Sequence, residues 1–165
     1  MQSLPRKIRV SIAAQRLDLL EISSVGDEQI RASFPVSTSG FGLGSEPGSH
    51  RTPLGRFAVG EKIGVGAPLG TVFVSREPTG EIAALASPGD PRDLVLTRIL
   101  WLEGREPHNA NTHERYIYIH GTNHEERVGE PCSHGCVRMR NADIAELFED
   151  VEPGMEVTIE ASPAV

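Results

Sequence analysis

Apolar and polar residues alternate along much of the first hundred positions, with the period of two that is typical of half-buried β-strands. The alternation at 8–12 is followed, after three further residues, by the leucine-rich stretch 16–22, which predicts a β-hairpin. A second alternation at 30–36, and shorter apolar pairs within 57–59 and 72–74, predict three more strands. The N-terminal half is therefore expected to be β-structure.

Glycine, serine and proline separate these strands. They are concentrated at 39–55, which predicts a long loop. Residues 75–93 contain three prolines and two glycines and predict an irregular excursion. The apolar stretch 94–102 predicts a buried strand, and 116–120 predicts another that ends on a histidine.

One helix is predicted, from about 142 to 151, because its apolar residues repeat at i, i+3, i+4 and i+7: Ile144, Leu147, Phe148 and Val151. Asn141 suits the N-cap, since its side-chain oxygen can accept a free amide N–H of the first turn. A last strand is expected at 155–159. Without an internal repeat or a linker, the pattern predicts a mostly β fold with one helix and a single domain over 1–165.

The net charge of the chain limits the classes of binding partner that are expected for it. The 165 residues include 16 Lys and Arg against 23 Asp and Glu, a formal net charge of −7. Such a chain is not expected to hold nucleic acid or an anionic membrane surface electrostatically, and no apolar run approaches the roughly 18 residues of a membrane span. The N-terminus, MQSLPRK, has no apolar stretch of the kind that a secretory signal needs. A cytoplasmic location is expected, or a periplasmic one if a signal has been removed.

Candidate chemistry is concentrated in the second half of the chain. His120 ends a predicted strand, and Cys136 follows sixteen residues later on a loop. A cysteine becomes a nucleophile when an imidazole or a positive field lowers the pKa of its thiol, because the thiolate is the attacking species. Gly135 would let backbone amides turn toward a developing oxyanion. The alternative for each residue alone is a satisfied core histidine and an inert buried cysteine.

The residues taken together resemble a known family. Ser133 to Arg138 reads Ser-His-Gly-Cys-Val-Arg, and twelve residues separate it from the His120 of His-Gly-Thr. This pattern resembles the signature of the L,D-transpeptidase (YkuD) catalytic domain, and the likeness extends over nearly the whole chain. It implies a β-sandwich-like domain with a helix packed alongside. Residues 61–93 match the family's common pattern least.

The resemblance implies a role for each residue of the motif. Cys136 would be the nucleophile and His120 the base, with the carbonyl of Gly121 orienting the imidazole. His134 would lie at the oxyanion with the backbone amides of Gly135 and Cys136. The resemblance implies neither a metal nor another cofactor.

Three further residues are expected to bind substrate. Arg138 would face a substrate carboxylate, where its fork of donors suits bidentate pairing. Ser133 would also contact the substrate, and Tyr118 would line the substrate groove. Tyr116 and Tyr118 could equally be amphipathic residues at a strand edge.

The resemblance also implies the substrate, a peptidoglycan stem tetrapeptide or muropeptide. The bond between its third residue and the terminal D-alanine would be attacked, leaving a thioester that water or an amine resolves. The absence of an export signal and of a wall-binding domain favours an L,D-carboxypeptidase of murein recycling. The alternative is an L,D-transpeptidase that forms crosslinks.

A structural zinc-binding module is the alternative from another class. The competent ligands are His120, His124, Cys132, His134 and Cys136. Two features oppose this reading, because the alternating Cys-x-His-x-Cys sends neighbours to opposite sides and Gly121 interrupts the helix that the pair of histidines needs. Cys132 could also form a redox pair with Cys136, although the resemblance requires only a turn there.

Overall fold

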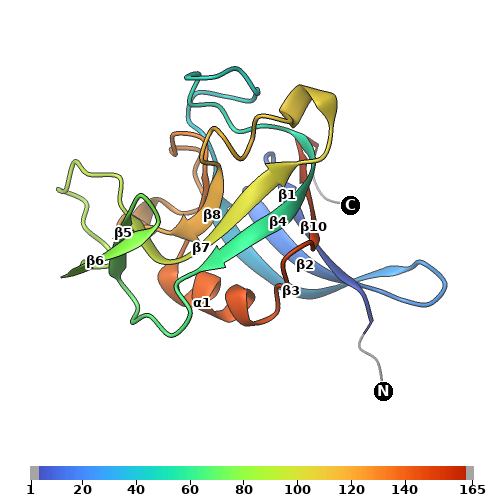
Figure 1. Cartoon of the computed structure of the whole chain (residues 1–165), viewed down its shortest axis with the longest axis horizontal. Coiled ribbons are helices and arrows are strands. Elements are labelled where there is room, and N and C mark those ends of the chain that lie inside the picture. The colour runs from blue at the N-terminus through green and yellow to red at the C-terminus, as the bar shows by residue number, and fades with distance from the viewer. Residues whose placement is uncertain (1–3, 163–165) are drawn as a thin grey trace.

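The computed structural model describes residues 4–162 (Figure 1). Within this range the strands are β1 (Arg6–Ser11), β2 (Arg16–Ile22), β3 (Glu28–Ser37), β4 (Gly55–Ile63), β5 (Thr71–Val74), β6 (Glu77–Ile82), β7 (Val95–Gly104), β8 (Tyr118–Gly121), β9 (Val137–Met139) and β10 (Glu156–Glu160). The helices are α1 (Asn141–Glu149) and two short 3-10 turns, η1 (Pro107–Asn109) and η2 (Glu125–Arg127). No helix of the described residues has the length and apolarity needed to cross a bilayer.

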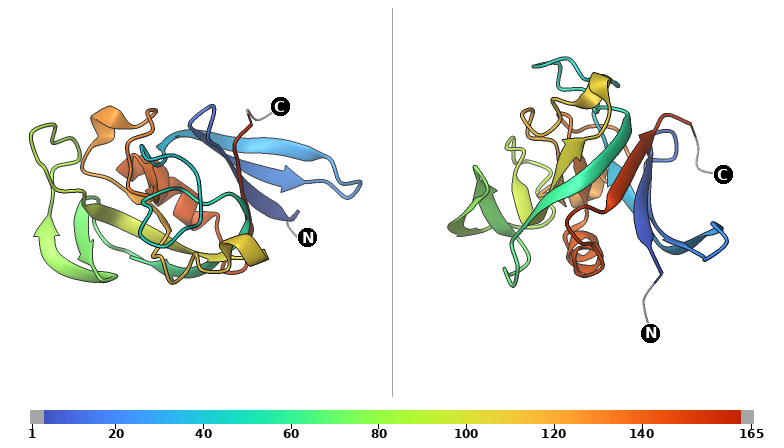
Figure 2. Two further views of the ribbon diagram at one scale, coloured as in Figure 1. Left: turned by 90° about the horizontal axis from the view of Figure 1, so that it is seen from above. Right: turned by 45° about the vertical axis from the view of Figure 1, so that its right-hand side comes forward.

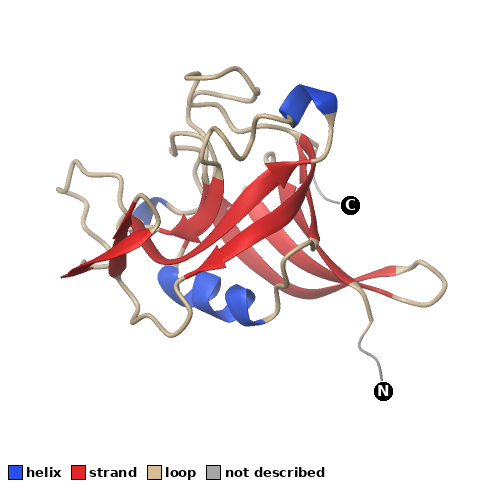
Figure 3. Ribbon diagram, in the orientation of Figure 1, coloured by secondary structure: helices blue, strands red, loops and turns tan. Residues whose placement is uncertain are grey.

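The strands form one sheet in the order β4-β10-β1-β2-β3-β9-β8-β7-β5-β6. Because β4 also pairs with β7, the first eight strands of this order close into a ring, and the β5–β6 hairpin extends from the edge of β7. Figure 2 shows this hairpin and the β2–β3 hairpin at opposite ends of the molecule. The predicted mostly β fold with one helix is confirmed (Figure 3).

The main hydrophobic core lies between the sheet and α1. The helix contributes Ile144, Leu147 and Phe148, as its period predicted, and the strands contribute residues such as Ile8, Leu17, Val36, Phe57, Leu100, Leu102, Ile119 and Val137. A second, smaller cluster consists of Phe73, Ile99, Trp101 and Tyr118, with the partly buried Cys136 packed against it. Successive side chains of a strand point to opposite faces, so β7 supplies Leu100 to one cluster and Trp101 to the other.

The strand expected at 116–120 begins only at Tyr118. Tyr116 has a positive φ of 58° and donates its amide N–H to the carbonyl of His113 at 3.0 Å, so it closes a turn instead of extending β8. Its ring is exposed. Tyr116 therefore does not share a strand face with His120.

The irregular excursion predicted at 75–93 contains a strand, β6, which pairs with β5. The two-residue turn between them consists of Ser75 and Arg76, with φ of 48° and 66°. Turns of this kind usually carry Asn-Gly or Asp-Gly, because glycine and asparagine tolerate positive φ best. The sequence therefore held none of the usual signals for this hairpin.

The first residues of α1 also differ from the prediction. Arg140 is the N-cap and Asn141 is the first helical residue. The carboxylate of Glu125 accepts the Asn141 backbone N–H at 2.7 Å and a side-chain N–H of Asn141 at 2.8 Å. The Asn141 side chain also donates to the carbonyl of Thr122 at 2.8 Å and accepts from the hydroxyl of Thr97 at 2.5 Å. Asn141 thus ties the helix to β7 and to the residue that follows β8.

We expect Asn141→Ala to lower the free energy of unfolding by about 2–3 kcal/mol, because two buried partners lose their hydrogen bonds. Urea denaturation followed by circular dichroism measures this change. The matched control is Glu146→Ala, at an exposed position of the same helix, which should change stability by less than about 0.5 kcal/mol. Equal losses in the two variants would contradict the role assigned to Asn141.

Candidate active site

Two short parallel strands bring the predicted catalytic residues together. In the pairing of β8 with β9, Ile119 lies opposite Val137 and His120 lies opposite Arg138. Ile119 and Val137 belong to the main core. Because side chains alternate along a strand, His120 and Arg138 share the other face of the sheet. The candidate site therefore lies on the face opposite the main core.

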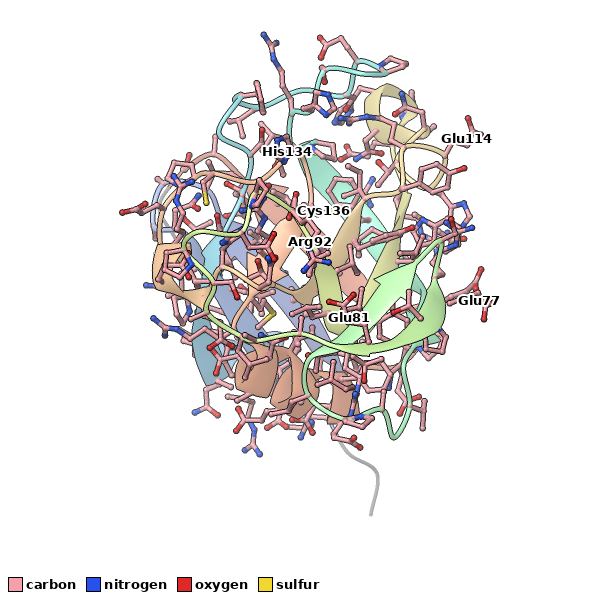
Figure 4. The ribbon with its side chains drawn as sticks, turned by 90° about the vertical axis from the view of Figure 1, so that its left-hand side faces the viewer. Glu77, Glu81, Arg92, Glu114, His134 and Cys136 are labelled. Atoms are coloured by element: carbon pink, nitrogen blue, oxygen red, sulfur yellow. The ribbon has the colours of Figure 1, made fainter. Side chains whose placement is uncertain are left out.

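Cys136 comes one residue before β9, beside the first residue of β8. Its Sγ accepts the backbone N–H of Tyr118 at 3.3 Å and is 3.4 Å from the carbonyl oxygen of Tyr116, to which the thiol donates. Figure 4 shows Cys136 near the middle of this face, between His134 and Arg92. The resting thiol is thus held by the backbone around Tyr118 and points its proton at a carbonyl.

The loop before Cys136 is shaped by its own hydrogen bonds. The hydroxyl of Ser133 donates to the carbonyl of Cys136 at 2.6 Å and accepts the N–H of Gly135 at 3.2 Å. Gly135 has a φ of 120°, which side-chain-bearing residues rarely adopt, and its carbonyl accepts from Thr52 at 3.0 Å. Ser133 is 1% exposed. The structure thus places Ser133 inside the loop, where it shapes the turn, and not on a substrate surface as expected.

The hydrogen bond from the Gly135 N–H to the Ser133 hydroxyl also changes the expected oxyanion site. Because the Gly135 N–H is directed at that hydroxyl, the Cys136 amide and the His134 side chain are the remaining donors of the expected set. The geometry thus separates two functions of the loop, since Ser133 and Gly135 build it and Cys136 and His134 face the site.

The His120 imidazole is buried and oriented by the carbonyl of Gly121, which lies 2.6 Å from its Nδ1. A carbonyl oxygen can only accept, so this contact places the ring proton on Nδ1 and leaves Nε2 as the free base. Burial lowers the pKa of His120, although the nearby charge of Asp93 and the Gly121 carbonyl act in the opposite direction. His120 is accordingly a neutral base at neutral pH.

The thiol pKa differs from the expectation that an imidazole would lower it. Burial raises the pKa of Cys136 to about 11, although the Tyr118 amide, Arg138 and Arg115 act to lower it. A neutral thiol at Cys136 and a neutral imidazole at His120 are therefore the resting forms. The resting structure holds no preformed thiolate at neutral pH.

Asp93 joins the site, and no sequence motif indicated it. Its carboxylate accepts from Arg138 at 2.8 Å and from Nδ1 of His134 at 3.0 Å. Burial acts to raise the pKa of Asp93, but the charge of Arg138 and the hydrogen bonds of Arg138 and His134 outweigh it, so the pKa lies below its usual range. Asp93 comes from the segment that the family resemblance covered least.

The Arg138 side chain is buried and binds partners within the protein. It is 4% exposed, and besides Asp93 it contacts the sulfur of Cys132 at 3.4 Å. The carboxylate that it was expected to find on a substrate is supplied by Asp93 in this structure. Arg138 thus connects the catalytic loop to the segment that precedes β7.

A polar cleft of about 360 Å³ adjoins the catalytic loop, with Asp93, His124, Cys132, His134 and Arg138 among its lining residues. Half of the His134 side chain is exposed at its mouth. The rings of Phe41 and His50, from the long loop at 39–55, lie 5.6 Å and 5.7 Å from the His134 ring. This loop therefore forms one wall of the site.

Tyr118 forms a different wall. It is 8% exposed, and its ring meets Trp101 edge-on at 5.7 Å and His120 at 6.5 Å. Its hydroxyl accepts from Arg76 at 3.2 Å. Tyr118 thus packs beneath Arg76, which sequence analysis did not single out, instead of lying open along a groove.

The ligands required by the zinc alternative are engaged separately. His120 contacts Gly121, Nε2 of His124 contacts the carbonyl of Arg92 at 2.9 Å, and His134 contacts Asp93. Among residues 4–162 no three His, Cys, Asp or Glu side chains are grouped to hold a metal ion. Cys132 and Cys136 are both free thiols, and the Cys132 sulfur lies 3.0 Å from the Ser37 hydroxyl.

The family profile described as "YkuD: L,D-transpeptidase catalytic domain" matches residues 5–159. A Bacillus licheniformis protein named L,D-transpeptidase YkuD is 26% identical over 157 residues, which cover 95% of this chain and 67% of that protein. A Bacillus subtilis protein of the same name is 34% identical over 90 residues, 53% of this chain and 47% of that protein. The crystal structure of an L,D-transpeptidase from Xylanimonas cellulosilytica matches with a TM-score of 0.55 and 19% identity, over 96% of this chain and 62% of that chain. The chain thus spans 47–67% of the length of these three proteins.

The high thiol pKa leads to a first prediction for the site. In a Cys132→Ala background, alkylation of Cys136 by iodoacetamide should keep accelerating up to about pH 11, since only the thiolate reacts. Intact-protein mass spectrometry at a series of pH values measures the rate. A short blocked peptide with one cysteine, whose thiol has the ordinary pKa of about 8.5, is the control. A plateau below pH 8 would show a thiolate–imidazolium pair in the resting protein.

The lowered pKa of Asp93 leads to a second prediction. A carboxylate whose pKa is lower in the folded than in the unfolded state stabilises the protein above its unfolded pKa, near about 3.9, and that contribution is lost as pH falls through the folded value. Asp93→Asn should therefore reduce the free energy of unfolding by about 2 kcal/mol at pH 7.

The difference in the free energy of unfolding between Asp93→Asn and the unsubstituted protein should shrink steadily below pH 4. Urea denaturation at several pH values measures it. Asp90→Asn removes a carboxylate whose partner Arg92 is half exposed, so its loss of stability should be clearly smaller than that of Asp93→Asn. A pH-independent loss in Asp93→Asn would contradict the charge argument.

Proposed function

The chain belongs to the L,D-transpeptidase (YkuD) catalytic-domain family, and on that basis we propose that it is a cysteine-nucleophile L,D-carboxypeptidase acting on peptidoglycan stem peptides. The reaction releases the terminal D-alanine of a tetrapeptide and leaves a tripeptide. The observation that carries the proposal is the shared sheet face of His120, Tyr118 and Cys136, with the His120 ring oriented by Gly121.

The first half of the reaction forms a thioester. Nε2 of His120 takes the proton of the Cys136 thiol as its sulfur attacks the carbonyl carbon of the third residue. The oxyanion that develops is stabilised by the Cys136 amide and by His134. The C–N bond then breaks, and the imidazolium of His120 returns the proton to the leaving amine of D-alanine.

The second half of the reaction hydrolyses the thioester. His120 takes a proton from water, whose oxygen attacks the thioester carbonyl, and the C–S bond breaks as the proton passes to the departing sulfur. The negative charge of Asp93 favours the protonated form of His120, and so stabilises the imidazolium that forms in both halves. Asp93 therefore assists catalysis through His120 and Arg138 without touching the substrate.

Two features support hydrolysis as the outcome. The cleft beside the loop, about 360 Å³, is lined by His134 but not by Cys136 or His120. It is near the lower end of the size range of small-ligand sites, so it offers little room for a second peptide next to the nucleophile. Water needs no second peptide site. A reducing compartment would keep Cys132 and Cys136 as the free thiols that the structure shows, which fits action on small muropeptides in the cytoplasm.

Incubation of the protein with purified disaccharide tetrapeptide and excess D-methionine tests the proposal. Mass spectrometry should find tripeptide and free D-alanine as the dominant products. A D-methionine-exchanged or dimeric product in excess would establish a transpeptidase instead.

Variants of the two cysteines complete the experiment. Cys136→Ala should abolish D-alanine release, by more than about 10³-fold for loss of the nucleophile. Cys132→Ala is the matched control and should retain most of the activity. Full activity in Cys136→Ala would refute the assignment of the nucleophile.

A further inference from the structure

Arg76 occupies a position that a charged residue rarely takes. It is the second residue of the two-residue turn between β5 and β6, and both Ser75 and Arg76 have positive φ, 48° and 66°. Glycine or asparagine would be favoured there, and a long side chain in this conformation costs free energy. Unfavourable backbone conformations of this kind are frequent where a protein must present a particular side chain.

The turn places the Arg76 guanidinium on an aromatic platform. Its carbon lies 4.7 Å from the centre of the Trp101 ring and 5.2 Å from that of Tyr116, and one of its nitrogens donates to the Tyr118 hydroxyl at 3.2 Å. Three rings thus hold one guanidinium, by cation–π attraction and a hydrogen bond. The side chain is ordered before any ligand arrives, which lowers the entropy lost on binding.

The positive charge of Arg76 is not neutralised at close range. None of the ion pairs among residues 4–162 involves Arg76; other arginines are paired, such as Arg92 with Asp90 and Arg138 with Asp93, while Glu61 attracts Arg76 from beyond ion-pair distance. Its chain neighbour Glu77 lies at the rim of the face in Figure 4, away from Cys136. The guanidinium is therefore an available partner for an anion.

The same two tyrosines connect Arg76 with the nucleophile. The Tyr118 amide donates to Sγ of Cys136 while the Tyr118 hydroxyl accepts from Arg76. The Tyr116 carbonyl accepts from the thiol while the Tyr116 ring lies beneath the guanidinium. Arg76 is thus about one tyrosine side chain away from the sulfur. A carboxylate on a residue that flanks the attacked carbonyl can span a comparable distance.

We propose that Arg76 is a specificity-determining residue that binds a carboxylate of the peptide substrate, the role that the sequence suggested for Arg138. This inference rests on the proposed function, because it assumes that a peptide carbonyl is presented to Cys136. Arg138 is buried against Asp93, whereas Arg76 keeps donors free to form a bidentate pair. The carboxylate is either the C-terminal one of the leaving residue or a side-chain carboxylate of the third residue.

The test compares three tetrapeptides that carry a diamino acid with a side-chain carboxylate at the third position. One has both carboxylates free, one is amidated at the C-terminus and one is amidated at the side chain. Arg76→Gln should raise KM for the first peptide about tenfold or more and leave kcat nearly unchanged, as expected for a charge-assisted hydrogen bond lost from substrate binding. Arg76→Lys should recover part of the loss.

The amidated peptides identify the source of the carboxylate. One of the two amidated peptides lacks the carboxylate that Arg76 binds. That peptide should bind the unsubstituted protein weakly, and Arg76→Gln should have little further effect on its KM. The other amidated peptide should still show the full tenfold loss. An equal loss on all three peptides would overturn the proposal, because it would show that Arg76 acts on the structure and not on a carboxylate.

Ser75→Gly is the matched control. It relaxes the same turn, leaves Arg76 in place and should preserve KM for all three peptides. A tenfold rise of KM in this variant would also overturn the proposal, because the turn geometry would then account for the effect.

A binding measurement separates this inference from the proposed reaction. Trp101 is the one tryptophan of the chain and lies under Arg76, so its fluorescence should respond when a peptide carboxylate binds. Titration of Cys136→Ala with the unmodified tetrapeptide should give a saturable signal, and the added Arg76→Gln substitution should weaken its Kd about tenfold. If the unsubstituted protein releases no D-alanine, the proposed function fails while this titration still decides the role of Arg76. Unchanged or undetectable binding in the titration overturns the inference.

Discussion

The candidate site depends on the parallel pairing of β8 with β9. Each strand is only three or four residues long, yet their register places His120 beside Arg138 and Tyr118 beside Cys136. The opposite faces of the same strands carry Ile119 and Val137 into the main core. The burial of apolar side chains on one face therefore maintains the alignment of polar groups on the other. A slip of one residue in the register of either strand would turn its apolar side chains away from the core and its polar side chains away from the site.

The electrostatics of the site follow from its burial. Desolvation disfavours charge on the Cys136 thiol and on the His120 imidazole, so both rest in the neutral form. The charges that remain nearby belong to Asp93 and Arg138, which neutralise each other at 2.8 Å. This arrangement places a fixed negative charge near the base without leaving an isolated ion in the protein interior. In the proposed reaction it favours proton movement during attack over a permanently ionised thiol.

The segment between β4 and β7 supplies two residues of the site, Asp93 and Arg76, that lie outside the sequence motif of His120 and Cys136. Asp93 ends the segment and holds the catalytic loop through Arg138 and His134. Arg76 lies at the tip of the β5–β6 hairpin and covers the aromatic platform beside the thiol. Neither residue contributes to the main core. A site of this kind keeps Cys136 and His120 on or beside short strands and receives its surrounding charges from the connections between strands.

The sequence by itself determined the strand periodicity, the helical face of Ile144 and Leu147, and the short motif that contains His120 and Cys136. These features are local, because they depend on residues a few positions apart and on backbone preferences such as the positive φ of Gly135. The tertiary structure alone decided that Ser133 closes the loop, that Arg138 meets Asp93 forty-five positions away, and that Arg76 stacks on Trp101. Contacts between distant segments, and the pKa values that burial sets, arise only when the sheet closes and excludes water. No local pattern in the chain encodes them.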